Sequence, residues 1–246
     1  MPDSRIRWWK LLIIGSVLAA IGGCTALRVA YSSGPTLVWW QIDGWLDTDR
    51  GQASAVRGAI DRWFAWHRST QITPTVALLA EAREQMLQAT TPEAVCRLNT
   101  RARALLEPAT TRAIEEAADL LPLLTEANLK AMADKGAEDL AEDREKFLQA
   151  DPAARRTEQL DRTRRRFERL YGRLAEPQLA VLREGLAELP LDPERWLAER
   201  EQRQRQTLAT LRRLQAERAP RDERVAALGA MLGQSMQPAD PVRRAQ

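Results

Sequence analysis

The stretch LLTEANLKAMADKGAEDL, residues 123–140, shows how this chain starts a helix. Thr125 carries a hydroxyl oxygen that can cap a helix, and Asn128 stands three positions later, as in a variant of the capping box. Leu124 and Leu129 occupy the two positions of a hydrophobic staple. The pattern predicts a helix from Thr125 to about residue 149. Its inward face comprises Leu129, Met132, Gly136, Leu140 and Phe147.

The same helical chemistry recurs along the chain. Val56, Ile60, Trp63 and His67 are spaced 4, 3 and 4 apart, which places them on one helix face. Ala, Leu, Arg, Glu and Gln dominate, β-branched residues are sparse, and no strand alternation is present. The sequence therefore predicts an all-α fold, a bundle of about eight to ten helices with short loops.

Three local patterns refine this expectation. Pro108 should bend or divide the helix that Thr91 caps, and Pro122 should end it, leaving a possible seam near residue 122. Residues 199–206 contain no apolar side chain, so this part of a long helix from about Asp192 should stand in water.

The first residues differ from the rest. Three basic residues precede an apolar run of eleven, residues 11–21, which is followed by Gly22-Gly23-Cys24. This is the order of a secretory signal, and the run is shorter than the roughly 20 residues that span a bilayer. Its end resembles the lipobox of bacterial lipoproteins. That resemblance implies cleavage before Cys24 and a lipid on its sulfur. The alternatives are an uncleaved signal anchor and a core helix.

The expected organisation follows. Residues 1–23 form the signal peptide, 24–35 the lipidated cysteine and tether, 36–237 the helical periplasmic domain and 238–246 a polar tail. The residue after Cys24 is Thr25, which resembles a signal for the outer rather than the inner membrane. We expect a lipid-anchored protein of the cell envelope that faces the periplasm.

A longer resemblance covers nearly the whole chain. The matching positions are Arg28, Tyr31, Leu37, Trp40, Ile42, Asp43, Leu46, Asp47 and Gln52, then Trp66-His67-Arg68 and the segment 143–156. With the cysteine before them they resemble a Gram-negative lipoprotein family of unknown function, with the pattern R-x-x-Y-N-N…W…L-D-x-Y-F-D-L. Here Ser32-Ser33 replace the asparagine pair and Gly44-Trp45 the aromatic pair. LTEAN and LAEPQ also resemble the L-T-x-x-Q motif of Spy-like periplasmic chaperones, although staple-plus-cap chemistry gives such strings in any helical bundle.

Charge and motif content exclude several functions. Residues 1–23 carry three basic and one acidic residue, or +2 of the net +3, which leaves +1 and gives no reason to expect nucleic acid binding. His67 is the only histidine, and no C-x-x-C, G-x-S-x-G or phosphate-binding glycine loop is present. We expect no catalytic residue, metal or cofactor. His67 should be structural, near a helix C-terminus; the alternative is a general base with Asp43 or Asp61. Cys96 should be half-buried.

Two groups of residues are candidate surfaces. Tryptophans gather close behind the lipid at positions Trp39, Trp40, Trp45, Trp63 and Trp66, where they could pack a core, face a membrane or partner, or stack on sugars. Arginines step along one predicted helix face at Arg155, Arg162, Arg166, Arg169 and Arg173, which is either a solvated surface or a site for anions.

Together these features predict a lipid-anchored helical protein of binding or structural type. Its partner would be the membrane plus an envelope protein, lipopolysaccharide or peptidoglycan, and its oligomeric state is left open. A Spy-like chaperone is the first alternative. A hydrolase that cleaves envelope glycan with a pair of carboxylates is the second.

Overall fold

The computed structural model describes residues 31–87, 91–148, 151–188 and 193–236. The predictions for the signal peptide, Cys24, Arg28 and the polar tail lie outside these residues.

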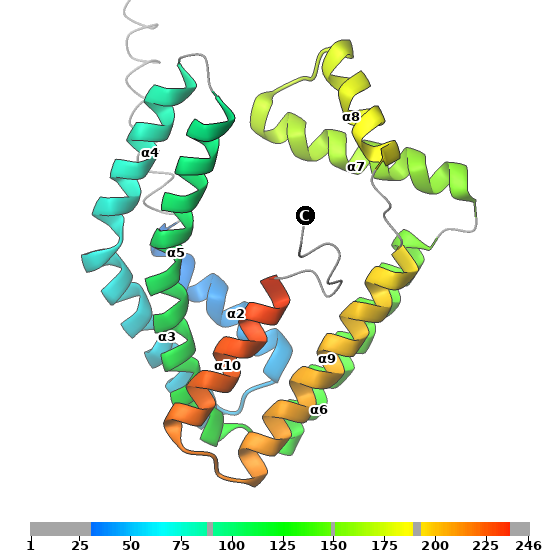
Figure 1. Ribbon diagram of the computed structural model, residues 1–246. Helices are drawn as coiled ribbons and strands as arrows, with labels where there is room; N and C mark the ends of the chain where they lie inside the picture. Colours follow the sequence, from blue (N-terminus) through cyan, green and yellow to red (C-terminus); the bar gives the residue numbers. More distant parts are fainter. Residues whose placement is uncertain (1–30, 88–90, 149–150, 189–192, 237–246) are drawn as a thin grey trace, which may run out of the picture. The chain divides into compact units, whose positions relative to one another are not determined.

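The all-α prediction is confirmed. The described residues form nine α-helices and one short 3-10 helix, joined by short connections (Figure 1). Their bounds are α2 Gly34–Leu46, α3 Arg50–Thr70, α4 Ile72–Met86, α5 Pro92–Leu120, η1 Leu121–Leu123, α6 Glu126–Phe147, α7 Pro152–Tyr171, α8 Glu176–Glu188, α9 Pro193–Ala216 and α10 Arg221–Met236. None of these helices combines the length and the apolar character that crossing a bilayer requires.

The chain divides into two compact units between Leu123 and Leu124. We call residues up to Leu123 the N-terminal unit and the following residues the C-terminal unit.

In the N-terminal unit, α3 packs against α2, α4 and α5, and α4 lies beside α5. Trp39, Val56 and Ile60 form the buried core, with Phe64 packed against it. A capping box starts α3. The Asp49 side chain accepts hydrogen bonds from backbone N–H groups, and the backbone N–H of Asp49 donates to the Gln52 side chain. The N-terminus of α2 approaches α3 closely: a Cβ on Gly34 would lie 2.7 Å from the Phe64 ring.

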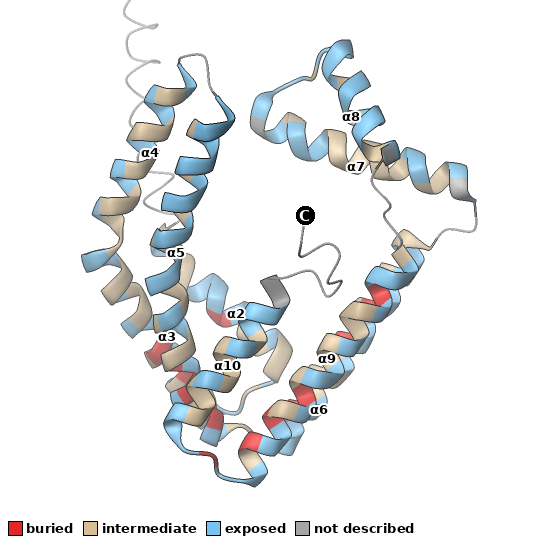
Figure 2. Ribbon diagram, viewed as in Figure 1, coloured by how far each residue is buried: buried red, intermediate tan, exposed pale blue. Residues whose placement is uncertain are grey.

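In the C-terminal unit, α6 and α9 run side by side (Figure 1), and α10 follows α9 and contacts it. The predicted capping box of α6 is present, because Thr125 caps the Asn128 N–H and the Asn128 side chain bonds back to Thr125. Leu129 is fully buried, with an exposed fraction of 0%. The other buried leucines of this pair are Leu140, Leu197, Leu208, Leu211 and Leu214 (Figure 2).

The apolar-free stretch 199–206 contains no buried residue, and Gln202, Arg205 and Gln206 are exposed as predicted, but its other face contacts α6. Arg200 pairs with Asp143 of α6, and Arg144 of α6 donates to Glu201 at 2.9 Å. Gln204 lies across α6 at Gly136, where any Cβ would collide with its side chain. Helix periodicity misses this interface because cross-helix ion pairs and a close backbone approach, rather than apolar side chains, hold it.

Pro108 does not divide α5, which is continuous from Pro92 to Leu120: both Pro108 and Ala104 are exposed, so solvent can reach the carbonyl that the proline leaves unpaired. The last two residues assigned to the tether, Gly34 and Pro35, begin α2. Cys96 is exposed rather than half-buried.

Candidate functional site: an apolar groove in the N-terminal unit

The predicted tryptophan cluster does not form one surface. Trp39 is buried, with 6% exposed, whereas its neighbour Trp40 is 63% exposed. Trp45, Trp63 and Trp66 are half-buried. The Trp63 N–H donates to the backbone oxygen of Ala109 at 2.9 Å, which fixes α3 against α5. The cluster therefore serves mainly to pack the N-terminal unit, while Trp40 faces solvent.

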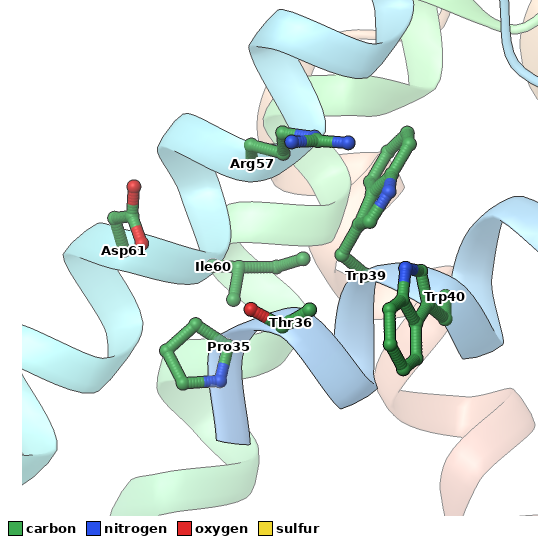
Figure 3. A pocket seen from close by; sticks show the side chains of 7 residues that line it. All are labelled: Pro35, Thr36, Trp39, Trp40, Arg57, Ile60 and Asp61. Atoms are coloured by element: carbon green, nitrogen blue, oxygen red, sulfur yellow. The ribbon is translucent and has the colours of Figure 1, made fainter. Parts of the chain in front are cut away.

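One pocket, of about 220 Å³, lies beside Trp39 between α2 and α3 (Figure 3). The guanidinium of Arg57 sits 4.4 Å from the centre of the Trp39 ring, a cation–π contact. Asp61 is the single carboxylate among the lining residues. A glycosidase site needs two carboxylates at a set separation, so this pocket gives a glycan hydrolase little support.

A second pocket, of about 280 Å³, is an open groove between α2, α3 and α5. Its walls are almost wholly apolar, and we call it the apolar groove. From α2 and α3 it is lined by Val38, Ile42, Val56, Ala59, Ile60, Trp63 and Phe64; from α5 it is lined by Ala113, Glu116, Ala117 and Leu120. Apolar surface of this kind is a site for apolar side chains or acyl chains.

Glu116 is the one carboxylate of the apolar groove, and two arginines neutralise it. Its side chain is 9% exposed. One carboxylate oxygen accepts from Arg62 Nε at 3.0 Å and Nη2 at 2.7 Å, and the other accepts from Arg112 Nη2 at 2.6 Å. The hydrogen bond to Glu116 raises the pKa of Arg62. Both oxygens of Glu116 are already bound to arginines, so this side chain is suited to joining α3 and α5 rather than to catalysis.

The first described residue, Tyr31, is fixed against the C-terminal end of α3. Its hydroxyl lies 2.9 Å from His67 Nδ1, and its ring packs edge-on against Phe64 with centroids 5.8 Å apart. His67 also stacks on Trp63 at 4.8 Å. Burial lowers the pKa of His67, which favours the neutral imidazole. We call these contacts the Tyr31 clamp. Within the described residues His67 bonds to Tyr31 and not to Asp43 or Asp61, so the contacts favour the structural interpretation of His67.

The α2 helix also has an exposed apolar face. Leu37, Val38 and Trp40 are all exposed, although α2 packs on α3 through Trp39 and Ile42. Asp43 is the only charged residue of α2, and it accepts a hydrogen bond from Thr48 at the end of the helix. An exposed tryptophan beside aliphatic side chains is typical of an interface with apolar surroundings.

The arginine face is split by the end of α7. Gly172 has a positive φ of 75° and ends the helix at Tyr171, so Arg173 lies beyond it and not on the predicted helical row. Arg155, Arg166 and Arg169 have no ion pair within the described residues. Arg162 instead lies 3.7 Å from Glu158 and covers the Phe147 ring at 4.6 Å.

Sequence reasoning missed Glu116, Arg62 and Arg112, and it missed the partner of His67. The Arg62–Glu116 and Tyr31–His67 contacts join positions 54 and 36 residues apart, which no local motif connects. Arg112 and Glu116 are an i,i+4 pair on one helix, a local spacing that could have indicated that contact. A metal site was not expected, and no cluster of three ligating side chains occurs in the described part of the chain.

The described residues form an all-helical protein, as the sequence predicts. Residues 44–224 match a family of unknown function, DUF6279. The match covers well over half of the chain, so the protein belongs to this family. No curated protein and no solved structure matches it.

Proposed function

We propose that the chain is a lipid-anchored binding protein of the bacterial cell envelope, and that its apolar groove holds an apolar segment of a partner protein. The observation that carries the proposal is the groove itself: about 280 Å³ of open, apolar-walled space, with its one carboxylate compensated. Apolar surface left open to solvent is costly, and burying it on a partner is favourable by about 25 cal/mol per Å².

The chemistry of the walls selects among the expected partners. Peptidoglycan and other sugars need hydrogen-bond donors and acceptors on the protein, and the groove offers Glu116, whose oxygens are already occupied. Apolar side chains of a protein segment need only apolar contact. The geometry therefore supports a protein partner better than a glycan.

The Tyr31 clamp supports attachment close to a membrane. Tyr31 follows the predicted lipid site, Cys24, by seven positions, which an extended chain covers in about 25 Å at most. The clamp fixes the chain at that point, so an anchor at Cys24 would keep α2 near the lipid surface. The exposed Leu37, Val38 and Trp40 suit that location.

A Spy-like chaperone is the second candidate, because an open apolar surface also suits an unfolded client. The two candidates differ in selectivity. A dedicated partner would occupy the groove as one defined segment, whereas a chaperone would bind many unrelated unfolded chains.

Site-specific photo-crosslinking in intact envelopes tests the groove. A photo-reactive amino acid at Ala113, which lines the groove, should crosslink one defined protein, and the same probe at the exposed Ala141 of α6 should not. Filling the groove with Ala117→Trp should remove the crosslink without unfolding the protein. Equal crosslinking from both positions, or a crosslink unaffected by Ala117→Trp in a folded variant, would refute the groove as the binding site.

The anchor has its own test. Cys24→Ser should abolish fatty-acid labelling and signal cleavage. If the Cys24→Ser variant still released a chain that begins at residue 24, the lipoprotein proposal would be refuted. The groove proposal would be unaffected, because the crosslinking experiment tests it separately.

A further inference from the structure

Positive charge is concentrated in one segment of the C-terminal unit. Residues 151–174, which comprise α7 and its flanking residues, contain eight arginines and four acidic residues, a net charge of +4. The whole chain carries +3, so all other residues together carry −1. The excess therefore belongs to this segment and is not a general property of the surface.

The acidic residues of α7 do not neutralise all of its arginines. We call Arg155, Arg162, Arg166 and Arg169, which follow one face of the helix, the arginine row. Glu158 lies within ion-pair distance of Arg162 and Arg165, and Asp161 pairs with Arg164 at 3.4 Å. The Glu168 carboxylate is directed to the Leu174 N–H. These acids thus pair with Arg162, Arg164 and Arg165 or bond to the backbone. Arg155, Arg166 and Arg169 have no acidic partner among the residues that the structure describes.

The geometry of these three arginines indicates the shape of their ligand. They lie within about 60° of one another around the helix and extend over about 21 Å, at 1.5 Å per residue. Arg166 and Arg169 are exposed and Arg155 is half-buried. A small anion needs donors that converge in a hollow, whereas a straight row on a convex helix meets an extended surface that carries many anions.

We infer that the Arg155–Arg169 row of α7 docks on an anionic lipid surface through the phosphate groups of its headgroups. Guanidinium forks match phosphate oxygens in pairs, and each arginine near such a surface contributes about 1 kcal/mol, or about fivefold in affinity. The inference rests on α7 and not on the groove; its test uses the proposed anchor at Cys24 only to hold the protein in a vesicle.

A vesicle-capture experiment with the full chain tests it. The protein is reconstituted in fluorescent phosphatidylcholine vesicles, and capture is measured on immobilised vesicles that contain about 30% phosphatidylglycerol, with pure phosphatidylcholine as the neutral surface. The parent should be captured only by the anionic surface. Arg155→Gln, Arg166→Gln and Arg169→Gln combined should lower capture by at least about tenfold, and the three Lys replacements should keep most of it.

A matched control removes the same charge elsewhere. Arg164→Gln, Arg165→Gln and Arg183→Gln eliminate three arginines that already have acidic partners at 3.4, 3.3 and 2.8 Å. This variant should retain much more capture than the row variant, with both folded by circular dichroism. Equal loss in the two variants would reduce the effect to net charge and overturn the inference. Capture that inorganic phosphate at the concentration of the headgroup phosphates abolishes would also overturn it, since the arginines would then bind a small anion and not a surface.

Discussion

Replacing Glu116 by glutamine tests whether the two arginines around it stabilise the N-terminal unit. The amide keeps the shape of the side chain but removes its charge. If the amide nitrogen takes the position of the oxygen that accepts from Arg62, two charge-assisted bonds are lost; otherwise the bond to Arg112 is lost. Hydrogen bonds to charged groups contribute about 1.5 to 3 kcal/mol each.

Solvation of the arginines offsets part of this loss. The Arg62 side chain is 57% exposed and that of Arg112 is 37% exposed, so both can regain water. We therefore expect Glu116→Gln to destabilise the N-terminal unit by about 2 kcal/mol, which lowers the thermal midpoint of a unit of this size by about 10 °C.

The neighbouring Glu115 provides a control on the same helix. It lies 3.7 Å from Arg112 and is 36% exposed, so Glu115→Gln should cost less than about 0.5 kcal/mol. Tryptophan fluorescence during thermal unfolding is the assay, because five of the eight tryptophans lie between residues 39 and 66. Equal midpoints for the two variants would refute the reasoning, since Glu116 would then be no more than a solvated surface partner of the arginines.

Three further predictions concern the Tyr31 clamp and the core of the C-terminal unit. His67→Ala should lower the stability of the N-terminal unit by about 1 kcal/mol in urea titrations, and His67→Gln by less, because glutamine can still bond to the Tyr31 hydroxyl. The parent should also lose stability as the pH falls below about 6.5, and the His67→Gln variant should lose less. Burial lowers the pKa of His67 in the folded protein, so the unfolded chain binds a proton at a higher pH than the folded chain does. Leu129→Ala should cost about 3 kcal/mol and accelerate amide exchange in α6 and α9 while leaving α3 unchanged. Equal acceleration in α3 would contradict this prediction and show that the two units unfold together.

Much of the fold was predictable because its signals are local. The α6 start was encoded by Thr125, Asn128 and the flanking leucines, and the structure contains both halves of that capping box. The predicted inward face of α6 is confirmed at Leu129, Gly136 and Leu140, which are all buried. Helix caps and periodic apolar residues depend only on the spacing of residues along the chain, which can be read directly from the sequence.

The groove was not predictable, because it depends on which helices lie side by side. Val38, Val56 and Ala113 belong to three helices, and nothing local assigns them to one wall. Arginine and glutamate are also poor guides: charged residues such as Arg62 and Glu116 look like surface residues until their partner is known. The tryptophans were ambiguous for a similar reason, since Trp39 and Trp40 are adjacent in sequence but face opposite environments.

Salt separates the two binding proposals, because they rest on different forces in different units. Docking of α7 on lipid phosphates is electrostatic, so it should be strong at low ionic strength and vanish near 1 M salt, where the Debye length is about 3 Å. Occupation of the apolar groove buries hydrocarbon, which screening does not weaken and which sulfate salts strengthen. Crosslinking from Ala113 should therefore persist or rise in about 1 M sodium sulfate while vesicle capture disappears. If both signals fall together, one electrostatic surface accounts for both, and the apolar groove is not a separate binding site.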